Sequence, residues 1–214
     1  MVRTPKTQAL VLAPLLGIGL FLFFYGLAAL TYPGGSNFDA NQLGFDMKSN
    51  YLCDLLDTNT PNGLPNPARS YARLSLLVLC SSLILLWYDL PKLFKLKSIN
   101  LSIMRTTSIL SLGLTLFLAA GNHDVILRIA GLLGVMALIS LFIELFKARY
   151  YALFVFGIWC LLIFVLNYLI YETGFSIVAL PIIQKITFLS FLLWFAFLNI
   201  TLFRVIKRRS NDWK

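Results

Sequence analysis

The chain has 214 residues, of which 59% are hydrophobic and 13% are charged, and its mean hydropathy is +0.82. Soluble globular domains average about 45–50% apolar and about 25% charged residues. A compact soluble fold of this size could not bury so many apolar side chains, and a disordered chain is excluded by the same numbers. The composition therefore predicts a protein that is integral to a membrane.

Six apolar segments are long enough to cross a bilayer, since a spanning helix needs roughly 20 mostly apolar residues. These segments are about 9–31, 67–88, 102–121, 125–146, 150–171 and 180–203. Their apolar residues run continuously, whereas the strands of a membrane barrel alternate. We therefore expect an all-α integral membrane protein, a six-transmembrane-helix bundle forming a single domain over 1–214. A long outer loop, 32–66, would join the first two helices.

The ends of these segments carry the expected signals. Arg3 and Lys6 precede the first span as in a signal peptide, but its apolar run over 11–30 exceeds the usual core of about 7–15 residues. We expect it to remain uncleaved. Pro91 follows the second span, where a helix cannot easily continue. Gly121-Asn122 is typical of a sharp turn and would separate the third span from the fourth.

Most of the 18 basic residues fall on one side of this topology. They are Arg3, Lys6, Lys92, Lys95, Lys97, Arg105, Lys147, Arg149, Arg204, Lys207, Arg208, Arg209 and Lys214. The positive-inside rule then places both termini in the cytoplasm, and we expect a bacterial cytoplasmic membrane. Membrane insertion and attraction to anionic headgroups explain the net charge of +9, so no nucleic-acid partner is expected.

The outer loop contains the aromatic and acidic stretch Asn50–Asp57. A loop of this length in a compact protein is usually either functional or disordered. Leu52, Leu55 and Leu56 have helical spacing, which favours a folded cap with a short amphipathic helix over a flexible tether. The cap could also dock a partner membrane protein.

Two arginines intrude into the apolar segments. Only residues 74–88 separate Arg73 from Asp89, too few to cross about 30 Å of hydrocarbon at about 1.5 Å per residue. The same argument applies to Arg128, which only residues 129–143 separate from Glu144. Arginine at a helix centre costs about 2.5–3.5 kcal/mol on insertion scales, and such residues usually face the bundle interior with a partner.

These arginines predict a polar pocket at the outer mouth of the bundle. The expected ligand-binding residues are Arg69, Arg73, Arg128, Asp124, Tyr168, Tyr171 and Glu172. Arginine binds phosphate bidentately, so an anionic lipid or amphiphile is the expected ligand, with the two carboxylates orienting the arginines. Asn167 and Lys185 would border the pocket. The alternative is simple anchoring, because arginine snorkels and tyrosine favours headgroup depth.

Signals for catalysis are sparse. His123 is the only histidine, and with Asp124 and Asp54 it forms the candidate set for a lipid-modifying hydrolase. A histidine at a turn or at the interface is the simpler interpretation, and a His-rich metal site is excluded. The chain contains no Walker loop, dinucleotide fingerprint or haem motif. We expect no cofactor and no metal, and the sequence leaves three functions open: a lipid-binding protein, which is favoured, a non-catalytic subunit of a membrane assembly, and a lipid-modifying hydrolase that uses His123 and Asp124.

Two short motifs give the layout a resemblance to known families. Asn50-Tyr51-Leu52-Cys53-Asp54-Leu55 lies just before the second span, and Asn122-His123-Asp124-Val125 lies at the outer start of the fourth. This arrangement resembles small membrane proteins with six to seven spans, which include uncharacterised bacterial families and the eukaryotic Frag/DRAM/Sfk-type proteins. Members often have Ser, an acidic residue and Gly where this chain has Cys53, Asp54 and Leu56. The resemblance implies a role linked to lipids.

Overall fold

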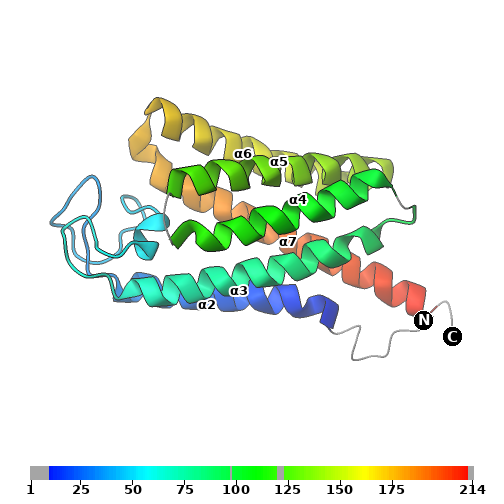
Figure 1. Cartoon of the computed structure of the whole chain (residues 1–214), viewed down its shortest axis with the longest axis horizontal. Coiled ribbons are helices and arrows are strands. Elements are labelled where there is room, and N and C mark those ends of the chain that lie inside the picture. The colour runs from blue at the N-terminus through cyan, green and yellow to red at the C-terminus, as the bar shows by residue number, and fades with distance from the viewer. Residues whose placement is uncertain (1–9, 97, 120–122, 212–214) are drawn as a thin grey trace.

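The computed structural model describes residues 10–96, 98–119 and 123–211, and it is all-α (Figure 1). The six long helices are α2 (Ala13–Thr31), α3 (Ala68–Asp89), α4 (Ile99–Thr115), α5 (His123–Lys147), α6 (Tyr151–Thr173) and α7 (Leu180–Asn211). The short 3-10 helices are η1 (Leu10–Leu12), η2 (Cys53–Leu56), η3 (Leu90–Leu93), η4 (Leu116–Ala119) and η5 (Ile177–Ala179). Six long helices were expected, and their order along the chain is confirmed.

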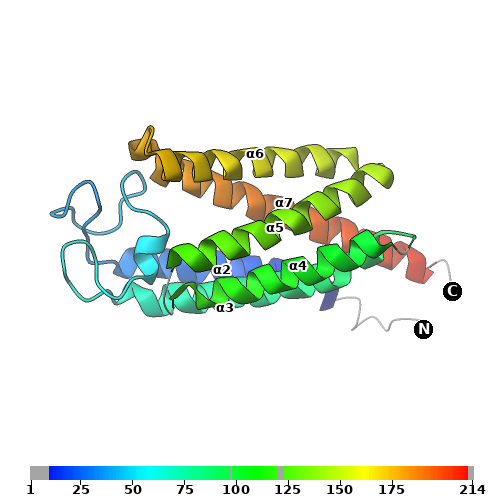
Figure 2. The same cartoon turned by 45° about the horizontal axis from the view of Figure 1, so that its top comes forward.

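Successive helices run back and forth along the long axis, so neighbours in sequence are antiparallel (Figures 1 and 2). The pairs α2–α3, α4–α5 and α6–α7 pack side by side, and α7 also contacts α2 and η3. Residues 32–67 lie at one end, which we call the loop end. The first and last described residues lie at the other, which we call the terminal end.

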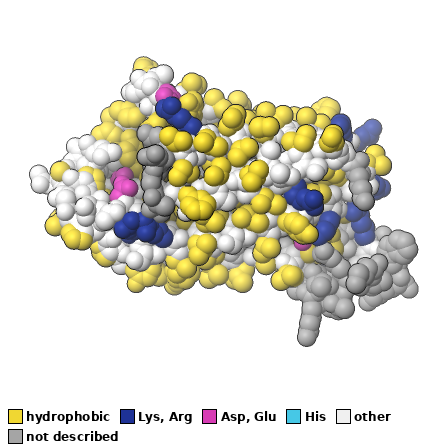
Figure 3. All heavy atoms as spheres, in the orientation of Figure 1, with side chains coloured by type: hydrophobic (Ala, Val, Ile, Leu, Met, Phe, Trp, Pro, Cys, Tyr) yellow, Lys and Arg dark blue, Asp and Glu magenta, His cyan; other side chains and the backbone are white. Residues whose placement is uncertain are grey.

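Five helical segments are long and apolar enough to cross a membrane. They are Leu10–Thr31, Ala68–Leu93, Val125–Lys147, Tyr151–Thr173 and Ile177–Asn211. On the face seen in Figure 3, hydrophobic side chains cover the middle of the bundle, and Lys and Arg gather mainly at the terminal end. The composition of these helices supports an integral membrane protein with several spans.

The third expected span differs from the other five. Its helix, α4, has 17 residues and continues as η4, so the regular helix is shorter than the expected segment 102–121. It also starts earlier, because the Ser98 side chain accepts a hydrogen bond from the Leu101 backbone N–H at 3.2 Å and caps the helix there. At about 1.5 Å per residue α4 alone extends about 26 Å. The turn expected at Gly121-Asn122 lies outside the described residues.

The centre of the core depends on one close approach of α6. The indole nitrogen of Trp194, on α7, donates a hydrogen bond to the Leu153 carbonyl of α6 at 2.8 Å. A Cβ added to Gly157 would lie 2.4 Å from a ring atom of Phe142 and 2.6 Å from the Trp194 ring. Glycine at this position therefore lets α6 pack directly against aromatic side chains of α5 and α7.

We expect Gly157→Ala to destabilise the bundle, because the new methyl group must displace two buried rings. Overpacking a core costs about 1–3 kcal/mol, and each kcal/mol lowers the melting temperature of a chain of this size by about 2–4 °C. Thermal unfolding in detergent measures the change. Gly26→Ala is the matched control, since a Cβ there meets no atom within 4 Å and alanine favours helix. Equal melting temperatures for the two variants would contradict this account.

Candidate functional site

The long loop is a folded cap, as the leucine spacing predicted. Its centre is Asn50, which is fully buried. The Asn50 side-chain amide donates to the Gly35 carbonyl at 2.8 Å and to Asp54 Oδ2 at 2.9 Å, and its Oδ1 accepts from the Asp46 backbone N–H at 2.9 Å. The expected amphipathic helix is a single 3-10 turn, η2, whose Leu55 is buried against α3.

The cap is fastened to two helices by contacts between distant parts of the chain. The Leu52 backbone N–H donates to Gln184 Oε1 at 2.8 Å, and Lys185 Nζ donates to the Asn50 carbonyl at 2.5 Å. Tyr25, on α2, donates its hydroxyl proton to the Leu52 carbonyl. Lys185 was expected at this mouth, whereas Gln184 and Tyr25 were missed. Gln184 and Tyr25 contact the cap because α7 and α2 lie next to it. The hydrophobic periodicity of the sequence does not predict which helices are neighbours of the cap.

Asp54, one of the three catalytic candidates, lies inside this cap. Its Oδ2 accepts from the Asn50 side chain and from the Tyr51 backbone N–H, both at 2.9 Å. Burial raises the pKa of Asp54 above its ordinary value of 3.8, although these hydrogen bonds act in the opposite direction. Burial also raises the pKa of the neighbouring Cys53 to about 12. The thiol is therefore protonated at neutral pH and is a poor nucleophile.

The raised pKa of Asp54 predicts a pH-dependent stability of the cap. The folded state binds this proton more tightly than the unfolded state, so the stabilisation is complete below pH 3.8 and is lost as the pH rises through the raised pKa. Asp54→Asn can accept both hydrogen bonds without titrating. We expect the melting temperature of the wild type minus that of Asp54→Asn to fall across this window. Asp39→Asn, at an exposed position of the same loop, is the control, and parallel pH curves for wild type and Asp54→Asn would refute the prediction.

Arg128 forms an ion pair with Glu172. Its Nη2 lies 2.9 Å from Glu172 Oε1, and the pair joins α5 to α6 near the loop end. The Arg128 side chain is 60% exposed, and Tyr168 and Tyr171 of α6 are also exposed. Asn167 donates instead to Thr187 of α7, between the helices. The pair of Arg128 and Glu172 is therefore internally neutral and lies toward the periphery of the bundle.

Arg69 and Arg73 lie one turn apart in the first two turns of α3, and both are partly buried. The Nε–H of Arg69 is buried and donates to no partner among the described residues, and Arg69 forms no ion pair with any of them. The side chains of His123 and Asp124 lie outside the described part of the structure. Within that part, no group of three or more His, Cys, Asp or Glu side chains could hold a metal ion.

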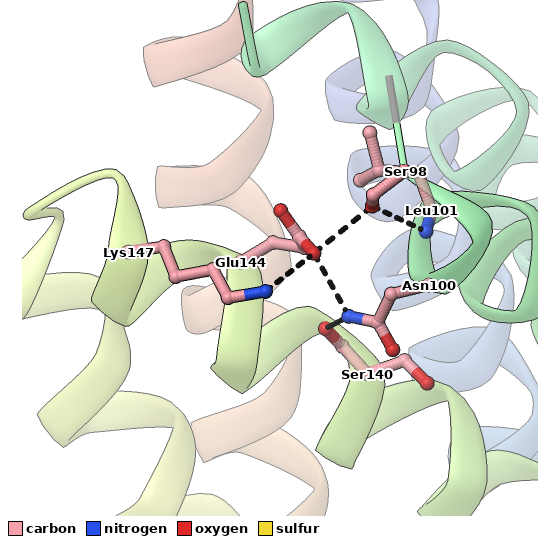
Figure 4. A network of polar contacts seen from close by, with 6 residues as sticks. All are labelled: Ser98, Asn100, Leu101, Ser140, Glu144 and Lys147. Carbon is pink, nitrogen blue, oxygen red and sulfur yellow. Dashed lines mark hydrogen bonds and ion pairs between the residues drawn. The ribbon is translucent and has the colours of Figure 1, made fainter. Parts of the chain in front are cut away.

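A second polar cluster lies near the terminal end, around Glu144 (Figure 4). Glu144 is buried on α5, and its Oε1 accepts from Ser98 Oγ and from the Asn100 side chain, both at 3.0 Å. Asn100 also donates to the Ser140 carbonyl at 2.8 Å, and Lys147 Nζ lies 3.7 Å from the carboxylate. The cluster ties the start of α4 to α5. The sequence indicated Glu144 only as a charge near the cytoplasm, because its partners come from another helix.

Comparison with known proteins gives no relative for this chain: no family model, curated protein or solved structure matches it.

Proposed function

We propose that this protein crosses a bacterial cytoplasmic membrane six times, with both termini in the cytoplasm, and binds an anionic lipid headgroup at Arg69 and Arg73. The packing of α4 against α3 and α5 supports the sixth crossing, because α4 runs alongside both of them between the two ends of the bundle (Figure 1). The concentration of basic residues toward the terminal end supports the orientation. The loop end then faces outward.

The observation that carries the lipid proposal is that Arg69 has no carboxylate partner among the described residues. A guanidinium with a buried Nε and no carboxylate partner among the described residues retains its terminal N–H groups for a ligand. Arg73 follows one turn later, and like charges at this spacing repel. A phosphate shared by both side chains replaces that repulsion with charge-assisted hydrogen bonds. Arg128 is less suited to the ligand because its Nη2 already donates a hydrogen bond to Glu172 at 2.9 Å.

The position of the two arginines fits a headgroup rather than a soluble anion. Arg69 is the second residue of α3, where the helix emerges from the apolar region at the loop end. At this depth the acyl chains of a bound lipid remain in the membrane while its phosphate meets the guanidinium groups. The resemblance in layout to Frag/DRAM/Sfk-type proteins, with its implied role linked to lipids, is consistent with this proposal.

Arg69→Gln should lower the occupancy of an anionic lipid about tenfold, because a hydrogen bond to a charged group contributes about 1.5–3 kcal/mol. Native mass spectrometry of protein delipidated in mild detergent and titrated with phosphatidylglycerol measures the occupancy, and phosphatidylcholine tests the selectivity. Lys48→Gln, at an exposed position of the same cap, is the control for nonspecific charge. Unchanged phosphatidylglycerol binding in Arg69→Gln would overturn the proposal.

A second candidate function, docking within a membrane assembly, is favoured by the apolar surface of the cap. Leu43 is 92% exposed, and Phe38 and Met47 are also exposed, although all three lie in the loop rather than in a span. Exposed apolar patches outside the membrane mark interaction surfaces. If the cap docks a subunit, Leu43→Asp should remove a stoichiometric partner from complexes isolated in mild detergent. Leu96→Asp, at the terminal end and 82% exposed, should retain it, and purification of the wild type without a partner would exclude this function.

A further inference from the structure

An apolar groove runs between α5 and α6 near the terminal end. It encloses about 440 Å³ and is bordered mainly by the apolar side chains of Ile139, Ile143 and Phe146 on α5 and of Phe154, Ile158 and Leu161 on α6. This volume falls within the range of about 300–1,000 Å³ that is typical of small-molecule sites. Both helices that border the groove are candidate membrane spans.

The length of the groove corresponds to one leaflet. Along α5 its walls extend from Ile139 to Lys147, which is about 12 Å at about 1.5 Å per residue. Half of a hydrocarbon core about 30 Å thick is of similar depth. Lys147 is the one charged residue among those that border the groove, and it is the last residue of α5.

Lys147 is positioned by the cluster shown in Figure 4. The Glu144 carboxylate lies 3.7 Å from its ammonium nitrogen and already accepts hydrogen bonds from Ser98 and Asn100. The Lys147 side chain is 65% exposed. The ammonium group therefore keeps N–H donors for an external anion at the mouth of the groove.

We propose that this groove holds one acyl chain of an anionic phospholipid from the leaflet at the terminal end, with its phosphate bound by Lys147. A groove one leaflet deep with a cation at headgroup level complements a phospholipid in both length and charge. This site is separate from the one proposed at Arg69, and either can exist without the other.

The test places a larger side chain in the groove and measures which lipid remains bound to the protein. Ile158→Phe should abolish retention of dipalmitoyl phosphatidylglycerol at this site in native mass spectra of detergent-washed protein. Val155→Phe, on the same helix, 63% exposed and outside the groove, should leave retention unchanged. Lys147→Gln should weaken phosphatidylglycerol binding about tenfold without affecting phosphatidylcholine, whereas Lys207→Gln, an exposed lysine near the C-terminal end of α7, should not.

Several outcomes would overturn the proposal. Equal retention in Ile158→Phe and Val155→Phe would show that the groove holds no lipid, and Lys147→Gln supplies a second test if Ile158→Phe unfolds in a thermal melt. A mass corresponding to two chains, lost in Ile158→Phe, would assign the groove to a second copy. Binding of glycerol phosphate as tight as that of the lipid would show an ion site without an acyl chain. Arg69→Gln should leave the lipid in the groove bound. A result that contradicts the groove proposal can therefore be distinguished from one that contradicts the proposal at Arg69.

Discussion

The structure depends on one constraint: in an apolar medium every backbone polar group must find its partner within the chain. Asn199, fully buried on α7, donates to the Val11 carbonyl of η1 at 2.8 Å, and Trp194 donates to the Leu153 carbonyl of α6. The hydrophobic effect does not drive helices together in lipid, so such contacts and close packing determine which helices adjoin. These two hydrogen bonds join α7 to η1 and to α6.

The polar groups at the two ends of the bundle find their hydrogen-bond partners in different ways. At the loop end, Asn50 organises a cap from backbone carbonyls and amide side chains, and Lys185 supplies the cation that fastens it. At the terminal end, the Glu144 carboxylate accepts hydrogen bonds from Ser98 and Asn100 at the start of α4. The polar networks hold the helix ends, while the middle of the bundle relies on aromatic packing around Trp194. Ligand binding is proposed where arginine or lysine donors remain available.

Sequence patterns predicted the helices because the length of an apolar segment can be read from consecutive residues, without knowledge of contacts between distant parts of the chain. The positions of five of the six long helices and the folded cap followed from hydropathy and leucine spacing, whereas α4 begins and ends earlier than the predicted segment 102–121. The contact between Lys185 and the Asn50 carbonyl could not be predicted, since 135 positions separate the two residues. Periodicity defines a face of a helix but not the neighbour opposite it, and Glu144 was missed for the same reason. The side chains of His123 and Asp124 are not described, so their roles remain predictions.

The fastening of the cap has a consequence for biogenesis. Residues 32–67 leave the ribosome early, between the first two helices, but Gln184 and Lys185 belong to the last helix of the chain. The Leu52 amide and the Asn50 carbonyl therefore bond to water until translation is nearly complete, because their partners on α7 are made last. The bonds that fasten the cap can therefore form only after the last helix has been made.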